Sequence, residues 1–157
     1  MLLLLLACAG VGDKETGTDD SAPLTCDTTN ETCGPGTCDG QGAQMLPGAD
    51  CLACHSDGGA YGAPTFTLGG TIFTERLGSQ GMEGVTIRVT GSEGTTVTMT
   101  SNSAGNFYST EAITQPFTAQ AEKDGVVLEM PDPVDNGGCN SCHSCLGWAF
   151  GKMYGPS

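Results

Sequence analysis

Hydrophobic and polar residues alternate through the middle of the chain, which is the pattern of half-buried β-strands. Val85, Ile87 and Val89 alternate with threonine and arginine, and the segment TTVTMTS repeats that period. The segments TFTLGGTIF, SNSAGNFYS, PFTAQAEK and GVVLEM are rich in residues that strands favour. Lys123-Asp124-Gly125 predicts a hairpin turn between the last two. The pattern predicts about six strands and no helix, and so a mainly β fold: a small antiparallel sandwich over residues 64–130.

The first of these strands has apolar residues on both faces. Phe66, Leu68 and Ile72 share one face of TFTLGGTIF, and Phe73 lies on the other face. The core as a whole should be small, because 25 glycines and an aromatic content of 6% leave little apolar area to bury. A chain of this kind often needs covalent cross-links or a bound group to stabilise it.

The N-terminal 25 residues lack the alternating pattern. The apolar run from Leu2 to Ala7 is too short to span a bilayer and ends at Cys8. The segment LLAC at its end resembles a bacterial lipobox, which implies export and lipidation of Cys8, with residues 1–8 as the signal remnant. The alternative is an ordinary signal peptide that contains Cys8. Residues 9–25 are acidic and aperiodic, which predicts a disordered tether.

Both histidines of the chain stand in the same motif. Cys51-Leu52-Ala53-Cys54-His55 and Cys139-Asn140-Ser141-Cys142-His143 are C-x-x-C-H sequences, the attachment signature of a c-type haem. In such a motif two thiols bind the porphyrin as thioethers and the adjacent imidazole ligates the iron. We therefore expect two covalently bound haem groups, one on residues 45–63 and one on residues 131–157.

Other chemistry for these motifs is less consistent with their spacing. Zinc can be held by paired cysteines, but a structural zinc site is usually one closed set of four ligands. Zinc also does not need a histidine directly after the second cysteine. A thioredoxin-like dithiol would lie in a βαβ pattern, which does not surround either motif. Zinc remains the alternative to haem.

The other cysteines have separate roles. Nine cysteines are present, four in the motifs and one at the lipobox. The remaining four can form two disulfides in an oxidising compartment: Cys26, Cys33, Cys38 and Cys145. Residues 26–44 form a loop without a core of its own. Because three of the four lie in this loop, we expect one of them to bond Cys145.

The sixth iron ligand cannot be a histidine of this chain if both motifs carry haem. Met45 and Met130 each stand shortly before a motif and a proline-containing turn, so we expect them to complete the coordination. Met153 is a reserve candidate for the second haem. The alternatives are that these methionines pack on the porphyrin faces, or that the iron keeps an open site.

Charge excludes several classes of partner. The net charge is −13, with 5 basic residues, which argues against binding to nucleic acid or to an anionic membrane surface. No Ser-His-Asp set is available, because both histidines are assigned to the motifs. Glu75 and Glu83 are better explained as solvated loop charges than as a catalytic pair. The acidic surface instead favours a redox partner with a basic docking face.

Part of the chain resembles known modules. Residues 65–130 contain a G-x-V-like strand in GGTIF, a GVTIRV strand and a SNSAGNFY turn. These resemble carboxypeptidase-regulatory-like or Cna B-like modules, which implies a prealbumin-like sandwich with a structural role. The arrangement of motif, sandwich and motif resembles exported bacterial cytochrome-like lipoproteins. That resemblance carries no established substrate.

Together these features predict an exported dihaem c-type cytochrome that transfers single electrons and is not an enzyme. A lipid anchor would hold it in a membrane facing the periplasm or cell surface, and self-association is conceivable. The alternatives are a zinc-containing surface binding module and a haem enzyme or sensor with an open iron site. An even number of antiparallel strands would also bring both motifs to the same end of the sandwich.

Overall fold

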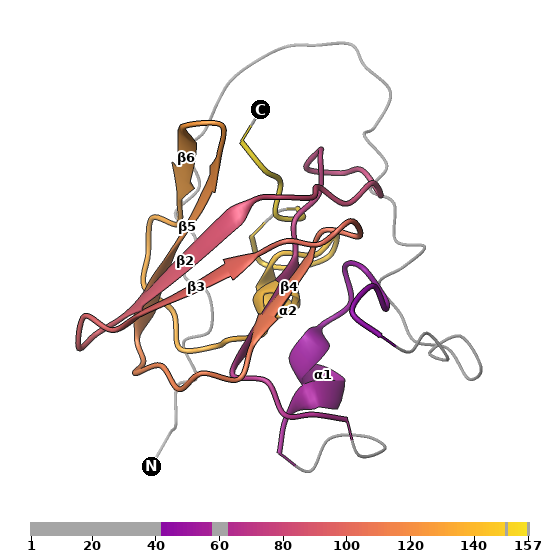
Figure 1. The fold of residues 1–157 in the computed structure, drawn as a ribbon. Coiled ribbons are helices and arrows are strands. Elements are labelled where there is room, and N and C mark those ends of the chain that lie inside the picture. Colours follow the sequence, from indigo (N-terminus) through magenta and orange to yellow (C-terminus); the bar gives the residue numbers. More distant parts are fainter. Residues whose placement is uncertain (1–41, 58–62, 150, 157) are drawn as a thin grey trace.

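Six short strands lie between two single-turn helices in the computed structural model, which describes residues 42–57, 63–149 and 151–156 (Figure 1). The elements follow one another along the chain as α1 (Cys51–His55), β1 (Leu68–Thr71), β2 (Thr86–Gly91), β3 (Thr96–Thr100), β4 (Asn106–Ser109), β5 (Phe117–Lys123), β6 (Val126–Glu129) and α2 (Cys139–Cys142). The expected mainly β composition is confirmed. The two helices coincide with the two C-x-x-C-H motifs, where the sequence pattern predicted none, because four or five residues are too few to show helical periodicity.

The strands form two antiparallel sheets. One has four strands in the order β3-β2-β5-β6, and the other pairs β1 with β4. In the larger sheet Val89 lies opposite Val97 on β3 and Ala119 on β5, and Ile87 lies opposite Met99 and Ala121. These residues therefore share one face of the sheet.

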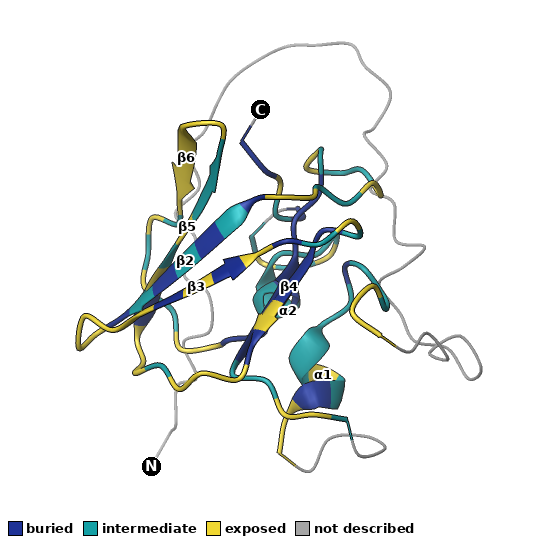
Figure 2. Cartoon of the chain, in the orientation of Figure 1, coloured by how far each residue is buried: buried dark blue, intermediate teal, exposed yellow. Residues whose placement is uncertain are grey.

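Both sheets contribute to one core (Figure 2). Leu68 and Phe107 come from the two-stranded sheet and are 0% and 3% exposed, while Val89 and Val97 of the larger sheet are each 1% exposed. Burying each such side chain stabilises the fold by about 1.5–3 kcal/mol. The alternation through Val85, Ile87 and Val89 predicted this face correctly.

The predicted hairpin joins β5 to β6. Asp124 and Gly125 have φ angles of 50° and 82°. Two successive residues with positive φ are what a tight two-residue hairpin requires, and an Asp-Gly pair adopts them at low cost. β6 then forms one edge of the larger sheet, and all four of its residues are exposed.

Both motif helices pack against β1, so the two motifs lie together rather than at opposite ends. The expectation of proximity is therefore met, but not by the expected route. The strands do not follow one another across a single sheet, and β1 pairs with β4. The motifs meet because α1 and α2 both pack against β1.

The predicted lipid anchor at Cys8, the acidic tether and the loop cysteines Cys26, Cys33 and Cys38 lie outside the described residues. Within residues 42–57, 63–149 and 151–156, no helix has the length and apolar character needed to cross a bilayer.

Candidate functional site

The first motif begins at a capped helix. The side chain of Asp50 accepts a hydrogen bond of 3.2 Å from the backbone N–H of Leu52, which satisfies one of the free donors at the start of α1. Cys51 and Cys54 are half-buried and have free thiols. Because they are three residues apart on a helical turn, the two thiols lie on the same side of α1. His55 follows directly, so two thiols and an imidazole come from one turn of helix.

His55 is held in one tautomer. Its ring is buried, and Nδ1 lies 2.8 Å from the carbonyl oxygen of Pro64. A carbonyl oxygen only accepts hydrogen bonds, so Nδ1 carries the proton and Nε2 of the neutral ring keeps its lone pair. The backbone N–H of Phe66 also donates to the carbonyl of His55, at 2.7 Å. Metal-ligating histidines usually have their second nitrogen fixed in this way. His55 is therefore prepared to bind a metal through Nε2.

Three aromatic rings stack outward from His55. The ring centroids of His55 and Phe66 are 4.1 Å apart, and those of Phe66 and Tyr108 are 4.6 Å apart, with interplanar angles of 10° and 14°. Tyr108 is 45% exposed, so the stack leads from a buried imidazole to the surface. The sequence pattern predicted that Phe66 shares a strand face with Leu68 and Ile72, but Phe66 lies outside β1. Phe66 precedes β1, and its ring covers His55 instead.

Two glycines allow both motifs to approach the same strand. A Cβ atom on Gly69 would lie 2.9 Å from Cβ of Cys51, and one on Gly70 would lie 2.9 Å from Cβ of Cys139. Such contacts are too short for real side chains, so both positions require glycine. Successive residues of a strand point to opposite faces. The first cysteines of the two motifs therefore flank the Gly69–Gly70 segment from its two sides.

Thr71 connects both motifs through buried hydrogen bonds. Its hydroxyl accepts from the backbone N–H of Gly48 at 2.8 Å and donates to Oδ1 of Asn106 at 2.7 Å. Its backbone N–H donates to Oδ1 of Asn140, at 2.8 Å. Thr71 thus joins the turn before α1, strand β4 and helix α2, which fixes the two motifs relative to each other.

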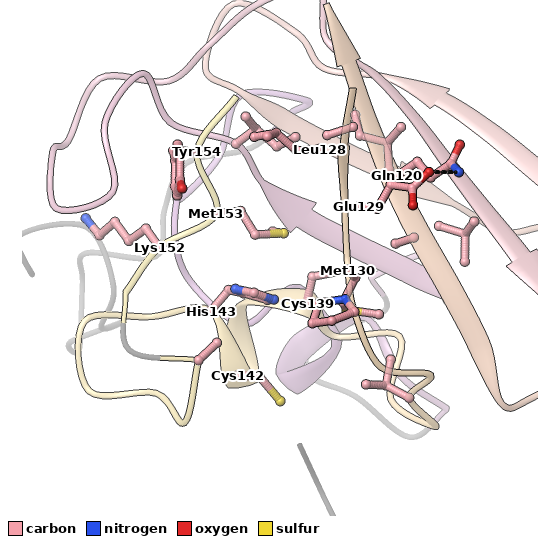
Figure 3. Close-up of a pocket in the computed structure, with 18 of the residues that line it drawn as sticks. Gln120, Leu128, Glu129, Met130, Cys139, Cys142, His143, Lys152, Met153 and Tyr154 are labelled. Carbon is pink, nitrogen blue, oxygen red and sulfur yellow. Dashed lines mark hydrogen bonds between the residues drawn. The ribbon is translucent and has the colours of Figure 1, made fainter. Parts of the chain in front are cut away.

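The second motif borders a large cavity (Figure 3). The cavity has a volume of about 730 Å³, which is within the range of small-molecule and cofactor sites. One wall is the face of the larger sheet, where β5 contributes the small side chains Ala119 and Ala121 beside Phe117 and Gln120. The opposite wall includes Cys139, His143 and Met153. Small residues on β5 therefore leave room beside the motif for a bulky apolar group.

The second motif contains a neutral imidazole and a buried amide without a hydrogen-bond partner. Burial lowers the pKa of His143, so its imidazole is neutral at pH 7 and has a lone pair for a metal. The side-chain nitrogen of Asn140 is buried and, within the part of the chain that the structure describes, lacks a hydrogen-bond partner. An unsatisfied buried donor costs about 1–3 kcal/mol. This donor is therefore a local cost to stability at α2.

Burial affects the first thiol of each motif. Burial, with a further contribution from Asp50, raises the pKa of Cys51 to about 11. Burial and the nearby Cys51 raise the pKa of Cys139 to about 12. Both thiols are therefore protonated at neutral pH when no metal is bound. Among the described residues, no three His, Cys, Asp or Glu side chains are grouped as a metal site would need.

Cys142 requires a correction to the sequence prediction. We expected both Cys139 and Cys142 to attach haem, but Cys142 is disulfide-bonded. A sulfur atom in a disulfide cannot also form a thioether. Cys145, which we expected to form a disulfide, is disulfide-bonded as well. The C-x-x-C-H pattern did not reveal this, because its spacing is the same whether or not its second cysteine bonds another sulfur.

The candidate methionine ligands separate into two groups. Met130 and Met153 line the cavity together with His143. Met45 is half-buried in the turn before α1, where its carbonyl accepts from Nδ2 of Asn106 at 2.8 Å, and it does not line that cavity. The structure thus brings two candidate methionines to the second motif.

Several residues of the site were missed by sequence reasoning. The Pro64 carbonyl is a backbone group, which no residue pattern marks. Paired glycines inside a strand were a usable signal for Gly69 and Gly70, because glycine there often marks a close approach of another segment. Thr71 looked like an ordinary strand threonine, and its role depends on three partners distant in sequence.

Comparison of the chain with family models, with curated proteins and with solved structures finds no match. The chemistry of the site therefore has to be argued from its own residues, and these combine two thiol-bearing helical turns, a tautomer-fixed imidazole and a cofactor-sized cavity.

Proposed function

We propose that the protein is an extracytoplasmic c-type cytochrome that carries haem at both motifs and transfers single electrons between partner proteins. The observation that carries the proposal is the first motif. Cys51 and Cys54 present two thiols on one side of α1, and the hydrogen bond from His55 Nδ1 to Pro64 leaves Nε2 to ligate iron. Haem iron, once bound, supplies the one-electron redox change.

The second motif supports the proposal through different observations. His143 is neutral at pH 7 because of burial, and it borders a cavity of about 730 Å³ with mostly apolar walls. Met130 lines the same cavity and is the proposed sixth ligand there, with Met153, which also lines it, as the reserve candidate. A thioether sulfur opposite a histidine raises the reduction potential, which suits electron transfer. Met45 is the proposed sixth ligand at the first motif.

The β-sheets serve as a rigid scaffold in this proposal, with a prealbumin-like topology. A lipid on Cys8 would anchor the chain outside the cytoplasm, and the acidic tether would hold the domain away from the membrane. The net charge of −13 favours a basic redox partner. Association with that partner should weaken as ionic strength rises, because screening shortens the reach of surface charges.

The experiment is to express the exported protein in a host that attaches haem and to measure its absorption spectrum and haem-to-protein ratio. The proposal expects Soret and α bands that survive acid-acetone extraction, since thioethers retain the haem. His55→Gln should alter the first haem and leave the second, and His143→Gln should do the reverse. A colourless protein that contains zinc would refute the proposal. Carbon monoxide binding to the reduced protein would favour a haem enzyme or sensor with an open site.

A further inference from the structure

The two cysteines of the second motif are in different chemical states. Cys142 is disulfide-bonded, whereas Cys139 has a free thiol. The cysteines of the first motif, Cys51 and Cys54, are also free. The disulfide of Cys142 therefore joins a sulfur outside its own motif and is not a bond between the two cysteines of a C-x-x-C pair. The first motif offers two thiols, and the second offers one.

The position of each sulfur agrees with this difference. Cys139 lies at the cavity wall beside Gly70, where a glycine Cβ would meet Cε of Met153 at 2.8 Å and Cβ of Cys139 at 2.9 Å. Figure 3 shows the sulfur of Cys142 pointing away from His143 and Met153. Cys142 also borders the cavity, but its sulfur is directed away from the imidazole and the thioether.

The backbone around Cys142 is held in this arrangement. The N–H of His143 donates to the carbonyl of Cys139 at 2.9 Å, and the N–H of Ala149 donates to the carbonyl of Cys142 at 3.1 Å. A Cβ atom on Gly147 would collide with that same carbonyl oxygen, so the loop after α2 lies directly against Cys142. The sulfur of Cys142 could bind a porphyrin only if its disulfide broke.

We propose that the second motif attaches haem through Cys139 alone, while Cys142 remains in its disulfide. This inference rests on the proposed function and adds an asymmetry between the motifs. The S–H bond of Cys139 adds across one vinyl group: a C–S bond forms, and the thiol hydrogen passes to the other vinyl carbon. No electron is gained or lost, and no oxidant or reductant is needed. The other vinyl group stays unchanged, and His143 provides the iron ligand.

The test is peptide mapping of the haem-loaded, full-length protein. Trypsin cleavage followed by reduction separates the first motif, in residues 15–76, from the second, in residues 124–152. Alkylation is carried out before and after reduction, because reduction opens disulfides and leaves thioethers intact. We expect the second peptide to carry one haem and to gain two alkyl groups, at Cys142 and Cys145, only after reduction. The first peptide should carry haem and gain no alkyl group at Cys51 or Cys54.

Two results would overturn the inference. One is a second peptide in which only Cys145 becomes alkylated, because Cys142 would then be a thioether. The other is a second peptide without haem beside a first peptide that carries it. Absence of haem from both peptides would instead refute the proposed function itself. A matched pair of variants adds an independent measurement: Cys142→Ala should retain covalent haem at the second motif, and Cys139→Ala should lose it.

Discussion

Replacing Gly70 by alanine should push the second motif away from β1. The added Cβ would lie 2.8 Å from Cζ of Phe107, 2.8 Å from Cε of Met153 and 2.9 Å from Cβ of Cys139. The Met153 methyl can turn aside because it is the end of a flexible side chain. The Phe107 ring is 3% exposed and packed in the core, and Cβ of Cys139 is fixed by α2. The strain must therefore be relieved by displacement of α2 or of β1.

The size of the effect follows from these contacts. Overpacking a well-packed core costs about 1–3 kcal/mol. For a domain of roughly 100 residues, each kcal/mol lowers the melting temperature by about 4–8 °C. A cost near the middle of this range, about 2 kcal/mol, corresponds to a decrease of roughly 8–16 °C. Thermal unfolding followed by circular dichroism measures this directly.

Two other glycines supply the controls. Gly69→Ala places its Cβ 2.9 Å from Cβ of Cys51, so it should disturb the first motif rather than the second. Gly78→Ala meets Cβ of Glu75 at 3.2 Å in an exposed turn, where a small shift of the backbone relieves the contact, and should be nearly neutral. In haem-loaded protein, Gly70→Ala should lower the haem content of residues 124–152 selectively. An unchanged melting temperature for Gly70→Ala would show that β1 does not set the position of α2, and would refute this reasoning.

The remaining predictions concern buried polar groups. Thr71→Val should destabilise the protein by about 1–3 kcal/mol in urea unfolding, because the N–H of Gly48 loses its acceptor and Oδ1 of Asn106 loses its donor. Thr71→Ser should recover most of this loss. An unaltered urea midpoint in the valine variant would contradict the hydrogen-bond network. The haem-free protein should also lose stability as the pH rises from about 9 towards 11–12. Folding raises the pKa of Cys51 to about 11 and that of Cys139 to about 12. The unfolded chain therefore forms these thiolates at lower pH than the folded chain, which favours unfolding. This alkaline loss should be smaller in Cys139→Ala, and a stability independent of pH between 8 and 11 would contradict it.

The strands were predictable because their signals are local. Val85, Ile87 and Val89 alternate with polar residues, and the period of two fixes which of them are buried. Asp124-Gly125 predicted its turn because few residue pairs tolerate two positive φ angles. The spacing of the C-x-x-C-H motifs also predicted that two thiols and an imidazole would come from one short segment, which is how α1 presents them.

The rest depends on contacts between segments distant in sequence. Pro64 acts through its carbonyl, and Phe66 through the packing of the loop that returns to His55, so neither had a distinguishing pattern. The neighbourhood of the two motifs was inferred from the number of strands, but it arises from packing on β1. Cys142 shows the same limit, because the state of a sulfur is decided by which other sulfur the fold brings near.

The glycine pair has a consequence for electron transfer under the proposed function. Cys51 and Cys139 flank adjacent residues of one strand. The two cysteines also interact electrostatically, since Cys51 contributes to the raised pKa of Cys139. Haem groups attached at these two sulfurs would be separated by the thickness of one strand at their attachment points. Their redox equilibria should then be coupled, so that oxidation of one disfavours oxidation of the other. A potentiometric titration should show two separated one-electron steps, and Cys139→Ala, which should lose the second haem, should show a single step. If the haem-loaded protein instead titrates as two independent and identical centres, the two motifs do not act as a pair.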